Sequence, residues 1–217
     1  MSIREELYTA YSDDNFEEFE NIIQTLGTYD PGKIVWSIHY HDRKYLRAVL
    51  SHEHTTVEYM YMSLFMENLN DMTEDDDVVI DLLFARMYPK NSKSAYDLLC
   101  RVALSNNPKT LEITLRQLLK YCELSIDQLA YVLYIQILST DRKMLDENPI
   151  VYIRAFVNAG VDISGFHYIL PDFLRYGKVF PGVARELVKH GIPKSAAYVT
   201  EYLKSTRYRS RLLMELS

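Results

Sequence analysis

The feature that most constrains the fold is a helical spacing of apolar residues that recurs along much of the chain. In four segments, apolar side chains are three or four positions apart, and many of the positions between them are charged or polar. These apolar residues are Phe16, Phe19, Ile22, Ile23 and Leu26; Tyr45, Leu46, Val49 and Leu50; Leu111, Leu115, Leu118 and Leu119; and Ile126, Leu129, Leu133, Tyr134 and Ile137. Such spacing places apolar residues on one face of an α-helix. No segment alternates with period two, so we predict an all-α protein with no strand.

Composition supports a folded chain. The 217 residues are 48% hydrophobic and 25% charged, with only seven glycines and seven prolines. A disordered chain is excluded because this sequence can bury enough apolar surface to offset its ordering entropy. The length suits one ordinary domain or two small ones, and we predict a single domain over residues 1–217.

Several short patterns mark helix boundaries. Ser2 and Glu5 fit a capping box, in which each side chain accepts a hydrogen bond from the other residue's backbone. Two Asn-Pro pairs fit an N-cap followed by proline at the first helical position, and they are Asn107-Pro108 and Asn148-Pro149. Gly160 and Gly191 each follow an apolar helical segment, so we predict that both are left-handed helix terminators.

The helix ends also repeat. The sequence of residues 157–162 resembles that of residues 188–193, and their glycines are 31 positions apart. A weaker copy occupies residues 118–123. Because one helical hairpin cannot cover its own apolar faces, neighbouring hairpins stack. We therefore predict stacked antiparallel helical hairpins in an α-solenoid.

Two longer segments carry a family resemblance. One runs from Gly165-Phe166-His167 through Tyr176-Gly177 to Gly191, with Pro181 starting its second helix, and the other spans residues 32–50. Both resemble the repeat units of degenerate ankyrin-repeat proteins, of the kind encoded by large DNA viruses. The resemblance implies an ankyrin-like solenoid that binds other proteins. The family's Thr-Pro-Leu-His turn is not intact, so plain paired helices of another α-solenoid are the alternative.

Charge is unevenly distributed. Residues 1–86 contain 18 Asp and Glu but 6 Lys and Arg, a net charge of −12, whereas residues 87–217 contain 12 and 18, a net charge of +6. A nucleic-acid-binding protein would carry a basic stripe, so we expect no nucleic-acid partner. An acidic N-terminal part and a basic C-terminal part can steer a partner or favour head-to-tail self-association.

The cysteines, the first 20 residues and the longest apolar stretch together predict the cellular compartment. Cys100 and Cys122 cannot form a disulfide framework, and we interpret them as buried thiols in a reducing compartment. The first 20 residues are polar and acidic, unlike a secretory signal. The apolar stretch Leu129 to Leu138, interrupted by Gln136, is too short to cross a bilayer. We expect an intracellular protein without a membrane partner, in the cytoplasm, or the host cytoplasm if viral.

Histidines provide the one candidate metal site. His39, His41, His52 and His54 lie close in sequence, and a hairpin could gather them around zinc with Asp42 or Glu53. The interpretation we favour is ordinary loop histidines, because the spacing that places two ligands on one helix face is absent.

Three further clusters have structural interpretations that we favour. The acidic run Glu74-Asp75-Asp76-Asp77 could bind a cation or a basic partner, but it lacks EF-hand spacing and fits a solvated helix N-terminus better. Tyr59, Met60, Tyr61, Met62 and Met66 could form an adaptable interface, but they fit filler between helices better. The basic tail Lys204–Arg211 could contact phosphate, although cations also favour a helix C-terminus.

Catalytic motifs are missing. The sequence contains no nucleophile elbow, phosphate-binding loop or dinucleotide fingerprint, so we expect no catalytic, cofactor-binding or metal-binding residues. The leading hypothesis is a non-enzymatic protein-interaction module that binds another protein through a groove or turn edge. The alternatives are a zinc-binding or metal-dependent protein that uses the clustered histidines, and a self-assembling structural protein.

Overall fold

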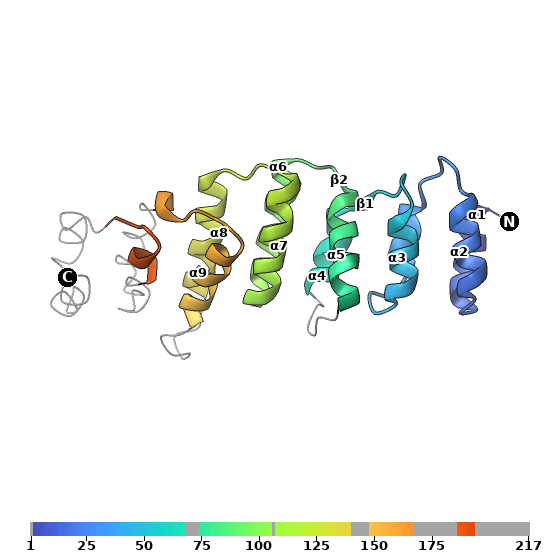
Figure 1. Ribbon diagram of the computed structural model, residues 1–217, viewed down its shortest axis with the longest axis horizontal. Coiled ribbons are helices and arrows are strands. Elements are labelled where there is room, and N and C mark those ends of the chain that lie inside the picture. Colours follow the sequence, from blue (N-terminus) through green and yellow to red (C-terminus); the bar gives the residue numbers. More distant parts are fainter. Residues whose placement is uncertain (1, 68–73, 106, 140–147, 167–185, 194–217) are drawn as a thin grey trace. The chain divides into compact units, whose positions relative to one another are not determined.

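The computed structural model describes residues 2–67, 74–105, 107–139, 148–166 and 186–193 (Figure 1). These residues form nine α-helices, two 3₁₀-helices and two strands of two residues each. The predicted all-α character is therefore confirmed, and the expectation of no strand is wrong in detail. The chain divides into two compact units, residues 1–98 with 117–123, and residues 99–116 with 124–217.

The elements follow one another along the chain in this order. The first unit contains α1 (Ile3–Ser12), α2 (Phe16–Thr25), η1 (Pro31–Ser37), α3 (Arg43–Ser51), β1 (Val57–Glu58), α4 (Tyr59–Glu67), α5 (Glu74–Arg86) and β2 (Met87–Tyr88). Helices α6 (Ser92–Leu104) and α7 (Pro108–Tyr121) contribute residues to both units. The second unit adds α8 (Ile126–Ser139), α9 (Asn148–Asn158) and η2 (Ser164–Phe166).

Local capping explains where several helices begin. The capping box is confirmed, because the Ser2 backbone N–H donates to Glu5 Oε2 at 2.7 Å and the Glu5 N–H donates to Ser2 Oγ at 3.3 Å. Asn107 is confirmed as the N-cap of α7, where its Oδ1 accepts from the N–H groups of residues 109 and 110. These contacts satisfy donors that the first helical turn leaves unpaired.

The core of the first unit lies around α3, which packs against α2, η1 and α5. Leu46, Val49 and Leu50 are fully buried on its inner face. The Tyr45 ring meets the rings of Tyr11 and Phe19 edge to face, with centroids 4.9 Å apart in both pairs. Burying such side chains contributes roughly 1.5–3 kcal/mol each, so this apolar face fixes the position of α3.

Hydrogen bonds to the Asp30 side chain join η1 to the loop before β1. The carboxylate of Asp30 caps η1 by accepting from the Gly32 N–H at 2.7 Å, and it accepts from the Thr56 N–H at 3.0 Å and from the Thr56 hydroxyl. The loop then forms β1, which pairs in parallel with β2 in the register Val57 to Met87. Two residues are too few to show an alternating pattern, which is why the sequence did not reveal these strands.

Glycines end helices as predicted. Gly160 and Gly191 have φ angles of +89° and +95°, which confirms both as left-handed terminators, and Gly27 after α2 has φ of +59°. Aspartates follow two of these glycines and cap 3₁₀-helices: Asp30 precedes η1, and the Asp162 side chain accepts from the Ser164 N–H at 2.9 Å before η2. The same local structure therefore occurs in both units.

In the second unit, α8 packs against α9 and η2. Gln136 interrupts the apolar run of α8, yet it is fully buried and its amide donates to the Ala103 carbonyl. Arg154 of α9 pairs with Glu186 at 2.9 Å. Over the described ranges, none of the helices combines the length and hydropathy needed to span a bilayer.

Some sequence predictions fall outside the described residues. They concern the basic tail 204–211 and the part of the repeat-like segment at residues 167–185, which contains Tyr176, Gly177 and the helix start at Pro181.

Candidate functional site

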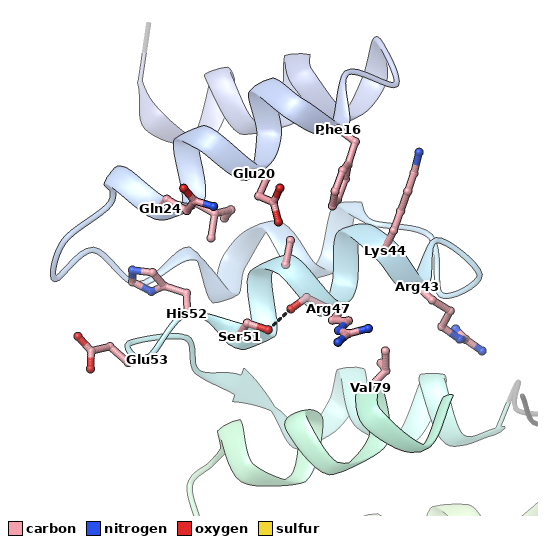
Figure 2. A pocket seen from close by; sticks show the side chains of 12 residues that line it. Phe16, Glu20, Gln24, Arg43, Lys44, Arg47, Ser51, His52, Glu53 and Val79 are labelled. Carbon is pink, nitrogen blue, oxygen red and sulfur yellow. Dashed lines mark hydrogen bonds between the residues drawn. The ribbon is translucent and has the colours of Figure 1, made fainter. Parts of the chain in front are cut away.

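The candidate site is a cavity over the outer face of α3, in the first unit. While Tyr45, Leu46, Val49 and Leu50 face the core, the opposite face of α3 carries Arg43, Lys44, Arg47, Ala48 and Ser51. Helix α2 borders this face on one side and α5 on the other (Figure 2). The amphipathic pattern of α3 thus determines both the packing of the helix and the composition of the cavity.

The cavity, here called the α3 cavity, has a volume of about 660 Å³. Its apolar lining comes from α2, α3 and α5 and consists of Phe16, Ile23, Ala48 and Val79. The polar lining consists of Glu20, Gln24, Arg43, Lys44, Arg47, Ser51, His52 and Glu53. The volume falls in the usual range of ligand-binding pockets, but with eight polar or charged residues among twelve the lining is more polar than is typical of them.

Two of the three cations on α3 are already paired. The Arg43 guanidinium binds the carboxylate of Asp76, which is only 1% exposed, and it lies 4.6 Å from the centre of the Phe65 ring. Lys44 pairs with Asp14 at 3.1 Å and lies 4.9 Å from the centre of the Tyr45 ring. These contacts fix the side chains at the N-terminal end of the cavity.

Arg47 differs from Arg43 and Lys44 in its lack of an ion pair. Within the described part of the chain its side chain has no ion-pair partner, and it is exposed. Figure 2 shows Arg47 on the side of α3 that faces Val79 of α5, whereas Glu20 lies on the α2 side. The cavity therefore offers a cation and a carboxylate on different walls.

The hydrogen-bond network at the start of α3 shifts the pKa of two residues. Hydrogen bonds from the Tyr45 hydroxyl, at 2.8 Å, and from Lys44 lower the pKa of Asp14. Burial, and then the hydrogen bond to Asp14, raise the pKa of Tyr45 to about 12. Tyr45 therefore stays protonated as a donor at neutral pH, and its hydrogen bond joins α3 to the turn between α1 and α2.

Arg86 fixes the C-terminal end of α3. Its Nε donates to the Leu50 carbonyl at 3.1 Å, and its Nη1 donates to the Glu53 carbonyl at 2.7 Å. A cation at these carbonyls suits the negative end of the helix dipole. The Ser51 hydroxyl donates to the Arg47 carbonyl at 2.7 Å, so its proton is engaged with main chain.

The four histidines do not converge. His39 and His41 have ring centroids 5.0 Å apart and precede α3, whereas His52 and His54 have centroids 5.8 Å apart and follow it. At 1.5 Å per residue, α3 keeps the two pairs at opposite ends of a helix roughly 13 Å long. No group of three or more potential metal ligands occurs in the described ranges. The hairpin arrangement that could gather all four around zinc is therefore not formed.

The acidic run is only partly as expected. Helix α5 does begin at Glu74, which places the run in its first turn. However, Asp76 is buried against Arg43 and is not solvated. Its burial follows from the packing of α5 on α3, which a run of four acidic residues cannot reveal.

The tyrosine and methionine cluster belongs mainly to the core. Tyr61, Met62 and Met66 of α4 are buried, so the filler interpretation is confirmed for these three, while Tyr59 and Met60 are partly exposed. Cys100 and Cys122 form no disulfide and are partly buried, and burial raises the pKa of the Cys122 thiol.

The sequence did not indicate that the lining residues of the α3 cavity form one site. His52 and Glu53 stood out only as candidate zinc ligands, and Arg43, Arg47 and Ala48 only as part of the repeat-like segment 32–50. No protein-family model, curated protein or solved structure matches the chain.

Proposed function

We propose that this chain is a non-enzymatic protein-interaction module that binds a segment of a partner protein in the α3 cavity. The observation that carries the proposal is the cavity itself, which has a volume of about 660 Å³ and is lined by four apolar and eight polar or charged residues. Apolar side chains of a partner segment would bury against Ile23, Ala48 and Val79. Charged groups on the walls would set the orientation of that segment.

The walls are held in place before any partner binds. The core contacts of Tyr45 and Leu46 fix α3, the Arg43–Asp76 pair joins it to α5, and Arg86 secures its C-terminal end. A surface that is already ordered loses little conformational entropy on binding, so more of the contact energy contributes to affinity.

Repeated helix ends support a broader form of this proposal. Gly27, Gly160 and Gly191 all adopt positive φ, and two of them precede an aspartate-capped 3₁₀-helix. We infer an ankyrin-like series of stacked hairpins that acts as an intracellular scaffold, in the cytoplasm of the cell or of a virus host.

A display library of random peptides tests the proposal while the natural partner is still unidentified. Peptides selected on the wild-type protein should lose binding to Ala48→Trp, because the indole fills the cavity. The matched control is Ala85→Trp, since Ala85 is also a partly exposed helical alanine but does not line the cavity. Circular dichroism confirms that both variants fold.

The expected result is a loss of at least about tenfold in affinity for Ala48→Trp, corresponding to about 1.4 kcal/mol, and little change for Ala85→Trp. The proposal is wrong if no selected peptide distinguishes the two variants. It is also wrong if the purified protein turns over a substrate in an unbiased activity screen and Ala48→Trp abolishes that turnover.

A further inference from the structure

A second cavity of the first unit is lined mainly by aromatic side chains. It has a volume of about 440 Å³ and is here called the Trp36 cavity. Its lining includes Tyr11, Trp36, Tyr40, Tyr61, Leu64 and Phe65. Trp36 is 46% exposed and Leu64 is 48% exposed, although both are large apolar residues. The cavity is therefore open to solvent beside two large apolar side chains.

The rings form walls that meet at a steep angle. Trp36 and Tyr61 lie edge to face, with centroids 5.5 Å apart and planes at 74°. Two ring faces at such an angle can both contact one compact group placed between them. The faces of aromatic rings attract cations, and tryptophan does so most strongly. Among the described residues, none of the cations that lie over an aromatic ring lies over Trp36.

The cavity also contains a polar group without a partner among the described residues. Tyr61 is 6% exposed, and its hydroxyl is buried without a hydrogen bond to any of them. A buried hydroxyl in a native structure normally has a partner, and within the described part of the chain the Arg43 Nη1 atom is buried without one as well. A phenolic oxygen can accept a hydrogen bond from an ammonium group.

Charges of both signs lie near the cavity. The Tyr11 hydroxyl donates to the Asp42 carboxylate, which brings a negative charge to the cavity wall. Arg43 lies over the Phe65 ring of the same wall and pairs with buried Asp76; burial raises the pKa of Tyr61 and the Arg43 charge lowers it, so one cation already acts on this hydroxyl. On a larger scale, residues 1–86 carry a net charge of −12, with 18 acidic and 6 basic residues. A basic partner is therefore attracted, and an acidic partner is repelled.

We propose that the Trp36 cavity binds a lysine side chain from a basic segment of another protein. The ammonium group lies against the faces of Trp36 and Tyr61 and donates to the Tyr61 hydroxyl, while the lysine methylenes pack on Leu64. Asp42 adds attraction through space. This site is separate from the α3 cavity, so it can serve the same partner or a different one.

The single tryptophan of the chain makes the site directly observable, because Trp36 is the fluorophore. A lysine–serine peptide and its counterpart with norleucine at each lysine position are titrated into the wild-type protein. Binding is followed by Trp36 fluorescence and by the anisotropy of a dye on the peptide. We expect the lysine peptide to shift the Trp36 emission and to bind at least about tenfold more tightly than the norleucine peptide.

Variants separate the cavity from general electrostatic attraction. Trp36→Leu keeps an apolar side chain at this position. It should lower the affinity for the lysine peptide by about fivefold or more in the anisotropy assay. Tyr61→Phe removes only the hydroxyl and should lower the affinity for the lysine peptide by about threefold or more. The matched control is Tyr8→Leu, because Tyr8 is an exposed aromatic residue of the same unit outside this cavity. Its affinity should stay within about twofold of wild type.

Three outcomes would overturn the proposal. The first is equal affinity for the norleucine and lysine peptides, and the second is Trp36→Leu binding like Tyr8→Leu, which would leave net charge as the cause. The third is a wild-type oligomer in sedimentation that Trp36→Leu dissociates, which would make a second copy of this chain the occupant. Ala48→Trp should still bind the lysine peptide, so failure at the α3 cavity and failure here are distinguishable.

Discussion

Among the described glycines, Gly32 is the one where an added methyl group would make the shortest contacts. A Cβ atom added there would lie well inside van der Waals contact of the Thr56 carbonyl oxygen, 2.9 Å from its carbonyl carbon and 2.9 Å from Asp30 Oδ1. Two of these contacts are with backbone, so no side-chain rotation relieves them. Gly32→Ala must therefore separate η1 from the loop that leads into β1.

The expected loss in the free energy of unfolding of Gly32→Ala has two parts. Overpacking a tight site typically costs about 1–3 kcal/mol. Separation also weakens the hydrogen bonds from Thr56 to the Asp30 carboxylate, and each bond to a charged group contributes about 1.5–3 kcal/mol, with the lower end applying at this exposed position. We expect a total loss of about 3 kcal/mol in the free energy of unfolding.

Urea unfolding followed by Trp36 fluorescence measures this loss, because Trp36 lies in η1 together with Gly32. With a slope of about 1.5–2 kcal/mol per M urea, the midpoint should fall by about 1.5–2 M. Gly27→Ala is the control: Gly27 has φ of +59°, but no atom lies within 4 Å of a Cβ added there, so this variant should lose only about 1 kcal/mol. Equal losses for the two variants would refute the proposed clash with Thr56.

Three other predictions concern charged and titrating side chains. Asp76→Asn leaves the Arg43 guanidinium without its buried partner and should cost about 3–4 kcal/mol in urea unfolding. The pKa of Tyr45 is raised to about 12, so the folded state should lose stability as pH rises from about 10 through 12, and Tyr45→Phe should reduce that loss in alkaline unfolding. The hydrogen bond from Arg154 lowers the pKa of Glu186 below 4.5. The ionised Glu186 carboxylate therefore stabilises the folded state above pH 4.5, and this contribution is lost as the pH falls further. Glu186→Gln should flatten this acid dependence when acid unfolding of the chain is followed by circular dichroism.

Each of these predictions has a clear contrary result. Asp81→Asn is the control for Asp76→Asn, because Asp81 forms an exposed ion pair with Lys120 at 3.3 Å and should cost less than about 1 kcal/mol. Similar losses at both positions would contradict the buried pairing. Tyr45→Phe with an unchanged alkaline profile, or Glu186→Gln with an unchanged acid profile, would show that other groups control those transitions.

Local sequence patterns predicted the elements well, and particular residues show why. The capping box of Ser2 and Glu5 and the terminators Gly160 and Gly191 depend on atoms within a few residues of each other. The helical spacing around Leu46 likewise indicates which face of α3 is buried. These features do not depend on where the neighbouring element lies.

Non-local contacts were not predictable in the same way. Asp76 was expected in solvent but pairs with Arg43, which lies 33 positions earlier in the chain. The histidine pairs looked close because only ten residues separate His41 from His52, yet α3 holds them apart. The β1–β2 pairing joins two loops that have no strand pattern of their own.

The sequence alone determined that this protein is built from short amphipathic helices with defined ends, because helix formation and capping are governed by neighbours along the chain. Only the tertiary structure decided which side chains meet across helices, and therefore where the α3 cavity and the Trp36 cavity lie. Packing brings together Phe16, Arg47 and Val79 from three helices, and no spacing within one helix encodes that meeting.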